Sequence, residues 1–287
     1  MIPFLKPPRL LPAPLPSEAD FLEATAVFKG DVSNHRVVAV GDHFVVKYGR
    51  AVEEAEGQTL LFLEQHSVKC LTAPKLYAMW RMHSTGHLCL VMERLPGENL
   101  ETLWPKLAEQ EKIAICSKLG AAIKHMRNLS PPEYFGGVGR SRIPHHLFWE
   151  PGNDPTICGP LDTESAFNAA FIKKLAVVYA SNPHLAASKI EYYERHLDSM
   201  LRNHMVTFSH SDLQRKNILV YTVGASFEIA IVDWEVAGWY PSYWEFAIEF
   251  ATLEWWVDDW PKYLEQAIEP WPFEAAVFRM IYQDLWF

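Results

Sequence analysis

The N-terminal part of the chain contains short apolar runs of the length and type found in β-strands. Residues 36–40 and 43–48 are rich in β-branched residues and are separated by a Gly-Asp pair, which predicts a β-hairpin. Residues 52–65 begin with glutamates and end with apolar residues, which predicts a helix. Residues 76–80 and 87–93 predict two more strands. This part of the chain is therefore expected to form a small sheet with one helix.

The rest of the chain mostly follows the period of amphipathic helices. Residues 136–160, rich in Gly, Pro and His, predict a long surface loop. Short strands are expected at residues 206–208, 218–221 and 227–232. The expected helices are residues 111–128, residues 162–181 with Asp162 as the N-cap, residues 185–202, and a tail after Pro241 whose buried face contains Trp244, Ile248, Ala251 and Trp255.

The chain is expected to have three parts. Six prolines among residues 1–16 exclude a regular helix or a central strand, so residues 1–20 are expected to form an extended arm. A Leu-Pro-Gly sequence at residues 95–97 interrupts the chain after the last strand of the first unit. We therefore expect a small N-terminal lobe over residues 21–94 and a larger, mainly helical lobe over residues 95–287. The predicted fold class is α+β with two lobes.

The composition is that of an ordinary globular protein, with 49% hydrophobic and 21% charged residues among 287. No apolar run reaches the roughly 20 residues that span a bilayer, and no secretory signal is evident. Cys70, Cys89, Cys116 and Cys158 form no CxxC pair, so reduced thiols are expected rather than a zinc site. These features predict a cytoplasmic protein. The net charge of −9 disfavours nucleic acid as a partner.

Three polar residues near the expected C-terminal strands have spacings that suit phosphoryl transfer. Asp212 and Asn217 are five positions apart, and Asp233 follows the strand at residues 227–232. An aspartate can orient the proton of an attacking hydroxyl, while Asn and Asp oxygens hold Mg²⁺ on nucleotide phosphates. Each residue alone is typical of a turn or cap. Together they predict an ATP-dependent phosphotransferase with Asp212 as catalytic base and Asn217 and Asp233 as metal ligands.

Lys47 is the expected cation on the nucleotide side. It ends an apolar strand, where a lysine is costly unless it meets an anion. Glu56 on the following helix is the favoured partner, and the pair would aim the ammonium at the α- and β-phosphates. Glu53 and Glu54 compete for this role, but they lie at the helix start, where the helix dipole favours them. The alternative is that Lys47 is a snorkelling surface lysine.

The segment at the expected lobe boundary is the candidate adenine site. Met92, Glu93 and Leu95 lie there, and an adenine would bind backbone groups, chiefly those of Glu93 and Leu95. Residues 29–34 are the only plausible loop to cover the phosphates. No G-x-G-x-x-G precedes Lys47, so the glycine-rich loop typical of protein kinases is absent from the sequence.

These residues resemble the aminoglycoside phosphotransferase and choline kinase-like family. In that family the catalytic loop typically reads His-Gly-Asp-x4-Asn, and the metal aspartate is commonly followed by Trp-Glu. Residues 210–220 and 231–235 match this pattern, and the candidates upstream match by position and type, so the resemblance covers most of the chain. It implies a two-lobed protein-kinase-like fold with ATP in the cleft, Asp212 as base, and Asn217 and Asp233 as metal ligands. Ser211, where glycine is usual, and the glycine-poor loop depart from the family pattern.

The expected acceptor is a hydroxyl of a small molecule. Only seven residues separate Asp233 from Pro241, which leaves no room for the peptide-docking segment of protein kinases. The family's C-terminal helices usually line the acceptor site, and here they contain an acidic, Trp-rich cluster. Such a wall would suit a cationic amine or an aromatic metabolite; alternatively, the tryptophans belong to the core and the acids to a solvated face. The cluster comprises Glu254, Trp255, Trp256, Asp258, Asp259 and Trp260.

Two other functions are compatible with the same sequence. One is a kinase-like protein that binds a nucleotide or ligand without transferring phosphate, which the glycine-poor loop favours. Retention of Lys47, Asp212, Asn217 and Asp233 argues against it. The other is a different transfer reaction carried out on the same fold.

Overall fold

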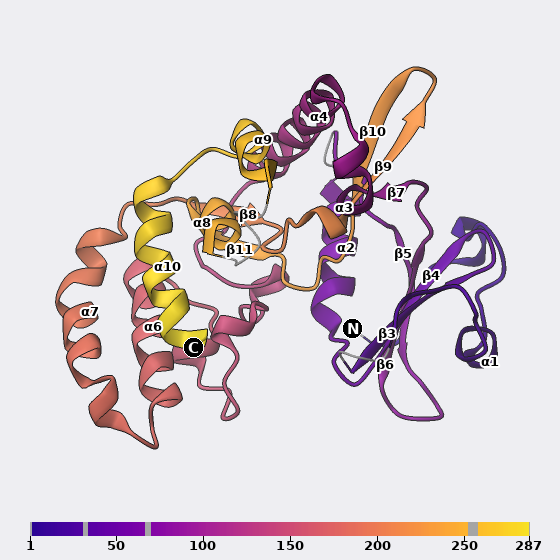
Figure 1. Ribbon diagram of the computed structural model, residues 1–287. Helices are drawn as coiled ribbons and strands as arrows, with labels where there is room; N and C mark the ends of the chain where they lie inside the picture. The colour runs from indigo at the N-terminus through magenta and orange to yellow at the C-terminus, as the bar shows by residue number, and fades with distance from the viewer. Residues whose placement is uncertain (1, 31–33, 67–69, 252–257, 287) are drawn as a thin grey trace.

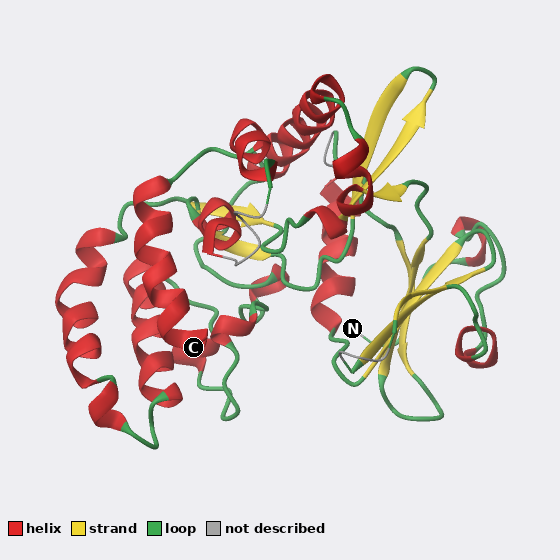
Figure 2. Ribbon diagram, viewed as in Figure 1, coloured by secondary structure: helices red, strands yellow, loops and turns green. Residues whose placement is uncertain are grey.

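The structure is a computed structural model that describes residues 2–30, 34–66, 70–251 and 258–286. One side of the molecule is built mainly from strands and the other mainly from helices (Figures 1 and 2). This is the two-lobed α+β architecture that the sequence predicted (Figure 2). None of the helices in the described part of the chain is long and apolar enough to cross a membrane.

The first lobe contains a six-stranded antiparallel sheet in the order β1-β5-β6-β4-β3-β2. The expected hairpin is formed by β3 and β4, in which Val37 pairs with Lys47 and Gly41 supplies the turn with a φ of +59°. The helix expected at residues 52–65 is α2. The elements are β1 (Phe4–Leu5), β2 (Val27–Lys29), β3 (His35–Val40), β4 (Phe44–Gly49), α2 (Glu54–His66), β5 (Leu76–Arg81) and β6 (Leu88–Glu93).

The alternation of side chains along β6 explains how this sheet is buried on both faces. Cys89 and Val91 pack with Phe21 of α1 (Glu18–Leu22) on the outer face. Leu90 and Met92 point the other way, into the large core shared with α2 and the second lobe. The sheet therefore has one face covered by the N-terminal segment and one that faces the second lobe.

The Pro-rich arm lies along the edge of the sheet. Phe4 pairs with Met79 in an antiparallel bridge, and the Lys6 amide donates to Tyr77 O at 2.9 Å. A short 3₁₀ turn, η1 (Pro8–Leu10), follows, with proline at its start, where no amide N–H is needed. The arm thus covers the outer strand β5, whose edge would otherwise expose unpaired backbone groups.

The second lobe is mainly helical. It also contains a three-stranded sheet in the order β10-β9-β7 and a two-stranded sheet of β11 and β8. The helices are α3 (Leu100–Leu103), α4 (Glu109–Arg127), α5 (Pro155–Cys158), α6 (Glu164–Val178), α7 (Ala187–Met200), α8 (Trp244–Ala251), α9 (Trp260–Ala267) and α10 (Pro272–Trp286). The strands are β7 (Glu98–Asn99), β8 (Val206–Ser209), β9 (Ile218–Val223), β10 (Ser226–Ile231) and β11 (Gly238–Pro241).

Some details of the second lobe differ from expectation. The N-cap of α6 is Thr163, whose hydroxyl accepts from the Ala166 amide at 3.1 Å, and not Asp162, whose carboxylate pairs with Arg140. Strand β11 was not expected. The predicted buried face of the tail is present at Trp244, Ile248 and Ala251, whereas Trp255 lies outside the described residues.

Candidate active site

The three catalytic candidates lie at the ends of strands β8, β9 and β10. Asp212 follows β8, and Asn217 ends the turn η7 (Arg215–Asn217) that leads into β9. Asp233 follows β10, which pairs with β9 so that Ile231 lies opposite Ile218. The Val232 amide then donates to Asn217 O at 2.9 Å, which fixes the two loops beside one another. The structure thus brings together three residues that the sequence separates by 21 positions.

Asn217 orients Asp212. Its amide Nδ2 donates to both the backbone oxygen and the carboxylate Oδ2 of Asp212, each at 2.8 Å. The Lys216 ammonium lies 3.5 Å from the same Oδ2. Asn217 is buried, whereas Asp212 is partly exposed. This arrangement holds the Asp212 carboxylate in one orientation through the Asn217 amide nitrogen, and the amide oxygen Oδ1 takes no part in these two hydrogen bonds.

A buried carboxylate that the sequence analysis did not select holds the catalytic loop. Glu245 of α8 is fully buried and accepts from the backbone amides of His210 and Ser211 at 2.6 and 2.9 Å. Burial raises its pKa, while His210 and these two amides oppose the shift. The signal for this residue is an acidic side chain inside an apolar helical run.

His210 links the catalytic loop to the loop that contains Asp233. Its Nε2 lies 3.0 Å from Val232 O, and its Nδ1 lies 3.3 Å from the Asp212 amide. A carbonyl only accepts and an amide only donates, so both contacts are satisfied when Nε2 carries a proton and Nδ1 accepts. The imidazole therefore connects the Asp212 and Asp233 loops through a single side chain.

Lys47 and Glu56 form a buried ion pair on the nucleotide side. Lys47 Nζ lies 2.8 Å from Glu56 Oε2, and each side chain is only 3% exposed. Glu53, one of the two competing acids, pairs instead with Arg142. Glu54 occupies the first turn of α2, where an acidic side chain favours the helix dipole. The structure thus places the acid preferred from the sequence beside the lysine and excludes the snorkelling alternative for Lys47.

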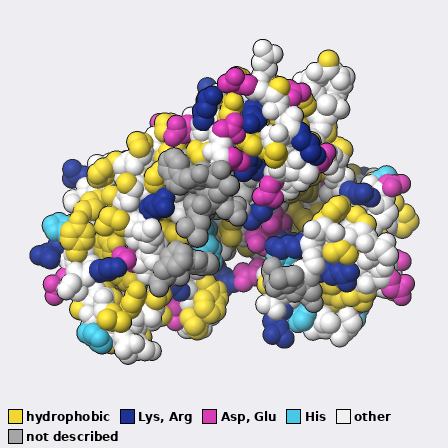
Figure 3. Space-filling model, in the orientation of Figure 1, with side chains coloured by type: hydrophobic (Ala, Val, Ile, Leu, Met, Phe, Trp, Pro, Cys, Tyr) yellow, Lys and Arg dark blue, Asp and Glu magenta, His cyan; other side chains and the backbone are white. Residues whose placement is uncertain are grey.

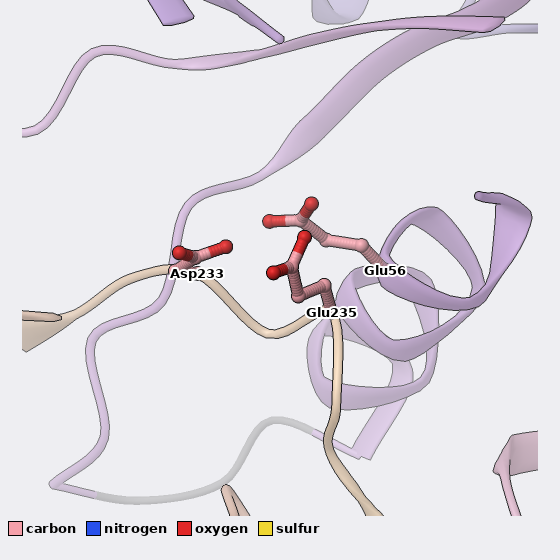
Figure 4. A group of neighbouring side chains, drawn as sticks. All are labelled: Glu56, Asp233 and Glu235. Atoms are coloured by element: carbon pink, nitrogen blue, oxygen red, sulfur yellow. The ribbon is translucent and has the colours of Figure 1, made fainter. Parts of the chain in front are cut away.

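The Lys47 ammonium also reaches the second lobe. It lies 2.6 Å from Asp233 Oδ1 and 2.7 Å from Glu235 Oε2. Carboxylate oxygens of Glu56, Asp233 and Glu235 lie within 4.8 Å of one another, and their side chains converge (Figure 4). In the space-filling view, acidic side chains gather where the two lobes meet (Figure 3). Glu235 was missed as a site residue, although the Asp-x-Glu spacing that places it there is visible in the sequence.

The charges of this cluster shift one another's pKa values. Burial would lower the pKa of Lys47, but the three carboxylates outweigh it and raise the pKa well above its ordinary value. Burial raises the pKa of Glu56 to about 7, with Lys47 opposing the shift. Burial tends to raise the pKa of Asp233, but the charge and hydrogen bond of Lys47 outweigh this effect, so the pKa is lowered. Lys47 and Asp233 are therefore both favoured in their charged forms.

The candidate adenine segment lies at the end of β6. The Glu93 amide donates to Lys75 O at 2.9 Å, and the Arg94 amide donates to His43 O at 2.9 Å. A nucleobase contact through Glu93 would therefore use its carbonyl oxygen. Met92 is 6% exposed, and its side chain belongs to the core cluster on the sheet face toward the second lobe. Leu95 follows the strand in the connection to β7.

The acidic, Trp-rich cluster is only partly described, because Glu254, Trp255 and Trp256 lie outside the described residues. Asp259 accepts from Trp104 Nε1 at 2.8 Å and pairs with Lys112, while Asp258 pairs with Arg215 at 2.6 Å. Trp260 is 5% exposed and packs edge-on against Trp104. For these three residues the structure supports the alternative interpretation, in which the tryptophan is core and the acids pair with nearby cations.

Fold and site together define a two-lobed, kinase-like phosphotransferase. The model of the phosphotransferase enzyme family, APH, matches residues 25–276 of the sequence, and the chain belongs to this family. A search of curated proteins by sequence found no match.

Solved structures of aminoglycoside phosphotransferases have the same fold. ADP-bound APH(2'')-Ib is 14% identical with a TM-score of 0.60, over 91% of this chain and 85% of that one. APH(4)-Ia is 16% identical with a TM-score of 0.57, over 93% and 84%. APH(2'')-IIa in complex with gentamicin is 14% identical with a TM-score of 0.55, over 87% and 77%. At these sequence identities the structural similarity establishes the fold alone, and the substrate has to be inferred from the residues of this chain.

Proposed function

We propose that the protein transfers the γ-phosphate of ATP to a hydroxyl of a small molecule, with Asp212 as catalytic base and Mg²⁺ as cofactor. The observation that carries this proposal is the position of Lys47. One ammonium contacts Glu56 in the first lobe and Asp233 and Glu235 in the second. A phosphotransferase of this fold needs the nucleotide lysine and the metal-binding acid in one place. Family membership supports the same class of reaction.

The donor set fits a divalent cation. Three carboxyl groups face one ammonium in a largely buried cluster, which leaves an excess of negative charge. Such an excess is costly away from water unless a cation offsets it, and carboxylate oxygens are ligands that Mg²⁺ prefers. Asp233 and Asn217, with Glu235 beside them, would hold the ion. When bound, Mg²⁺ supplies positive charge that offsets the charge of the nucleotide phosphates.

Asp212 is the residue that would receive the acceptor's proton. Asn217 holds it in one orientation, and Glu245 fixes the backbone of its loop. A carboxylate positioned in this way can orient an attacking hydroxyl and accept its proton as the phosphoryl group is transferred. The nucleotide segment near Met92, Glu93 and Leu95 would bind the adenine at the other end of the cleft.

The acceptor is proposed to approach Asp212 beside Glu249 of α8 and Tyr282 of α10. Asp212 is close enough to contribute, after burial, to raising the pKa of both groups. The partly exposed Asp212 carboxylate favours an acceptor that carries an amine, since a positive charge near the reacting hydroxyl would be attracted to it. An amine with a hydroxyl, such as an amino sugar, is therefore the proposed class, and neither nucleic acid nor a membrane is an expected partner.

The direct test is an acceptor screen. The purified protein is incubated with Mg·ATP and a panel of amino sugars, simple amino alcohols and aromatic alcohols, and nucleotide consumption is followed. ³¹P NMR of the products then distinguishes a phosphate ester from other transfer products. Asp233→Asn is the matched variant and should abolish turnover. Absence of Mg·ATP binding by calorimetry at millimolar nucleotide would refute the proposal and favour a ligand-binding protein without transfer activity.

A further inference from the structure

A histidine follows the candidate phosphate loop directly and lacks a hydrogen-bond partner for one ring nitrogen. His35 is the first residue of β3 and is only 5% exposed. Its Nε2 is buried and makes no hydrogen bond within the described part of the chain. A buried ring nitrogen without a partner is costly, so such an atom calls for a ligand or another explanation. The sequence analysis did not select this residue.

The sheet register places His35 on the same face as Lys47. Val37 lies directly opposite Lys47, and directly opposed residues of an antiparallel pair point to the same face. His35 is two positions before Val37 and therefore points to that face as well. Gly49, the residue opposite His35, carries no side chain there. The imidazole and the Lys47 ammonium thus share the sheet face directed at Asp233 and Glu235.

The backbone around His35 is held closely by β4. Asn34 O accepts from the Ala51 amide at 3.2 Å. A Cβ on Gly49 would lie 2.5 Å from Asn34 O and 2.7 Å from His35 Cα, so only glycine permits this approach. Gly49 has a φ of +140°, which L side chains rarely adopt. The position of His35 is therefore set by the sheet.

We propose that His35 Nε2 donates a hydrogen bond to the β- or γ-phosphate of the bound nucleotide. The inference rests on the proposed function and adds to it a specific phosphate contact. Protein kinases supply such contacts from a glycine-rich loop, which this sequence lacks. A side-chain donor at the start of β3 would replace part of that backbone cradle.

Electrostatics agree with a neutral donor. Burial, followed by Lys47 and Lys29, lowers the pKa of His35, whereas Glu235 and Asp233 oppose the shift. A neutral imidazole has one N–H and one acceptor nitrogen, so the Nε2–H form can donate to a phosphate oxygen without adding a second buried cation next to Lys47.

The test compares binding of Mg·ATP, Mg·ADP and AMP by calorimetry for the wild type, His35→Phe and His35→Gln. Phenylalanine fills similar space without a donor, and glutamine keeps an N–H donor near the position of Nε2. A hydrogen bond to a charged group corresponds to a loss of about tenfold in affinity on removal. We expect His35→Phe to bind Mg·ATP about tenfold more weakly with unchanged AMP affinity, and His35→Gln to recover much of the loss. Mg·ADP should weaken equally for a contact with the β-phosphate and stay unchanged for a contact with the γ-phosphate.

Two controls separate the possible failures. His43→Phe alters an exposed histidine in the turn of the same hairpin and should bind like the wild type. A misfolded variant would lose AMP together with ATP, and His35→Gln then decides whether the donor matters. Equal Mg·ATP affinity of wild type and His35→Phe would overturn the His35 contact alone. Wild-type protein that binds no nucleotide would overturn the proposed function and the contact with it.

Discussion

Trp244 Nε1 donates a hydrogen bond to Ser211 Oγ in the core of the second lobe. Ser211 is 2% exposed and has a φ of +72°, in the left-handed region where glycine is favoured. A side chain in this region costs about 1–2 kcal/mol. The hydroxyl offsets this cost because it gives a buried indole N–H its partner. This contact explains how the catalytic loop accommodates serine at the position where the family usually has glycine.

The pair predicts an order of stability among Ser211 variants. Ser211→Ala keeps the backbone strain and leaves the Trp244 N–H unpaired, so the free energy of unfolding should fall by about 1–3 kcal/mol. Ser211→Gly also loses the acceptor but relieves the strain, so its loss should be smaller. Urea denaturation measures both, with the exposed Ser188→Ala as control. Ser211→Ala with wild-type stability would contradict this account.

Lys47 is predicted to be important for stability as well as for nucleotide binding. Lys47→Met leaves Glu56, Asp233 and Glu235 facing one another without the ammonium. Removing one partner of a buried ion pair typically costs 3–5 kcal/mol, and we expect about 3 kcal/mol because Glu235 is 40% exposed and partly solvated. Chemical denaturation gives the free energy of unfolding for this variant.

A surface lysine provides the comparison. Lys75 is 53% exposed and pairs with Glu93 at 3.6 Å, so Lys75→Met should cost less than about 1 kcal/mol. If the two lysine variants lost equal stability, Lys47 would not be the central cation of the cluster. If Lys47→Met kept full affinity for Mg·ATP, the lysine would not contact the nucleotide phosphates.

The local sequence predicted the elements well where one physical signal dominates. The hairpin of β3 and β4 follows from two β-branched runs around a glycine that adopts a positive φ. The neighbourhood of Lys47 and Glu56 follows because a strand end and the first turns of the next helix are joined by a short connection. In both cases the interacting residues are close in the sequence.

Contacts that depend on tertiary packing were not predicted. Glu245 contacts His210 and Ser211 across 35 and 34 positions of sequence, and its role depends on where the tertiary fold places α8 beside the loop after β8. Glu235 joins the acidic cluster only because the loop after β10 turns toward Lys47, with Asp233 at a φ of +64°. The N-cap of α6 is Thr163 rather than the predicted Asp162, because threonine and aspartate both cap helices well and only the backbone geometry distinguishes the two positions.

Glu56 predicts a pH dependence of stability. Burial raises the pKa of Glu56 from its ordinary value of 4.5 to about 7, so between these values the folded protein binds the proton more tightly than the unfolded chain does. The contribution of this group to stability is therefore fully present below about pH 4.5 and is lost as the pH rises through about 7. Asp233 has a lowered pKa and titrates below this window.

The variant Glu56→Gln isolates this contribution. Glutamine does not titrate, so the fall in the free energy of unfolding between about pH 4.5 and 7 should be smaller than in the wild type. Thermal or urea unfolding at a series of pH values measures the slope. An unchanged slope in Glu56→Gln would show that Glu56 exchanges no proton in this range. Glu64→Gln, a partly exposed position on the same helix, is the control.

Asp212→Asn separates catalysis from binding and folding. Asparagine has nearly the same shape but cannot accept the acceptor's proton, so kcat should fall by about 10²–10⁴-fold. In the wild type, Asp212 Oδ2 accepts a hydrogen bond from Asn217 Nδ2. The side-chain oxygen of the new asparagine can accept the same bond, so the loop geometry and the stability should change little. Mg·ATP affinity should also stay close to that of the wild type, because Asp212 is not among the acids that contact Lys47.

The measurements are steady-state kinetics on the acceptor found by the screen, with calorimetry for the nucleotide. Asp42→Asn, in the exposed turn between β3 and β4, is the matched control and should retain wild-type turnover. If Asp212→Asn turned over at the wild-type rate, the base would have to be sought at another residue. A fall in kcat with unchanged nucleotide affinity assigns the proton-accepting role to Asp212, since only the reaction step would then have lost an interaction.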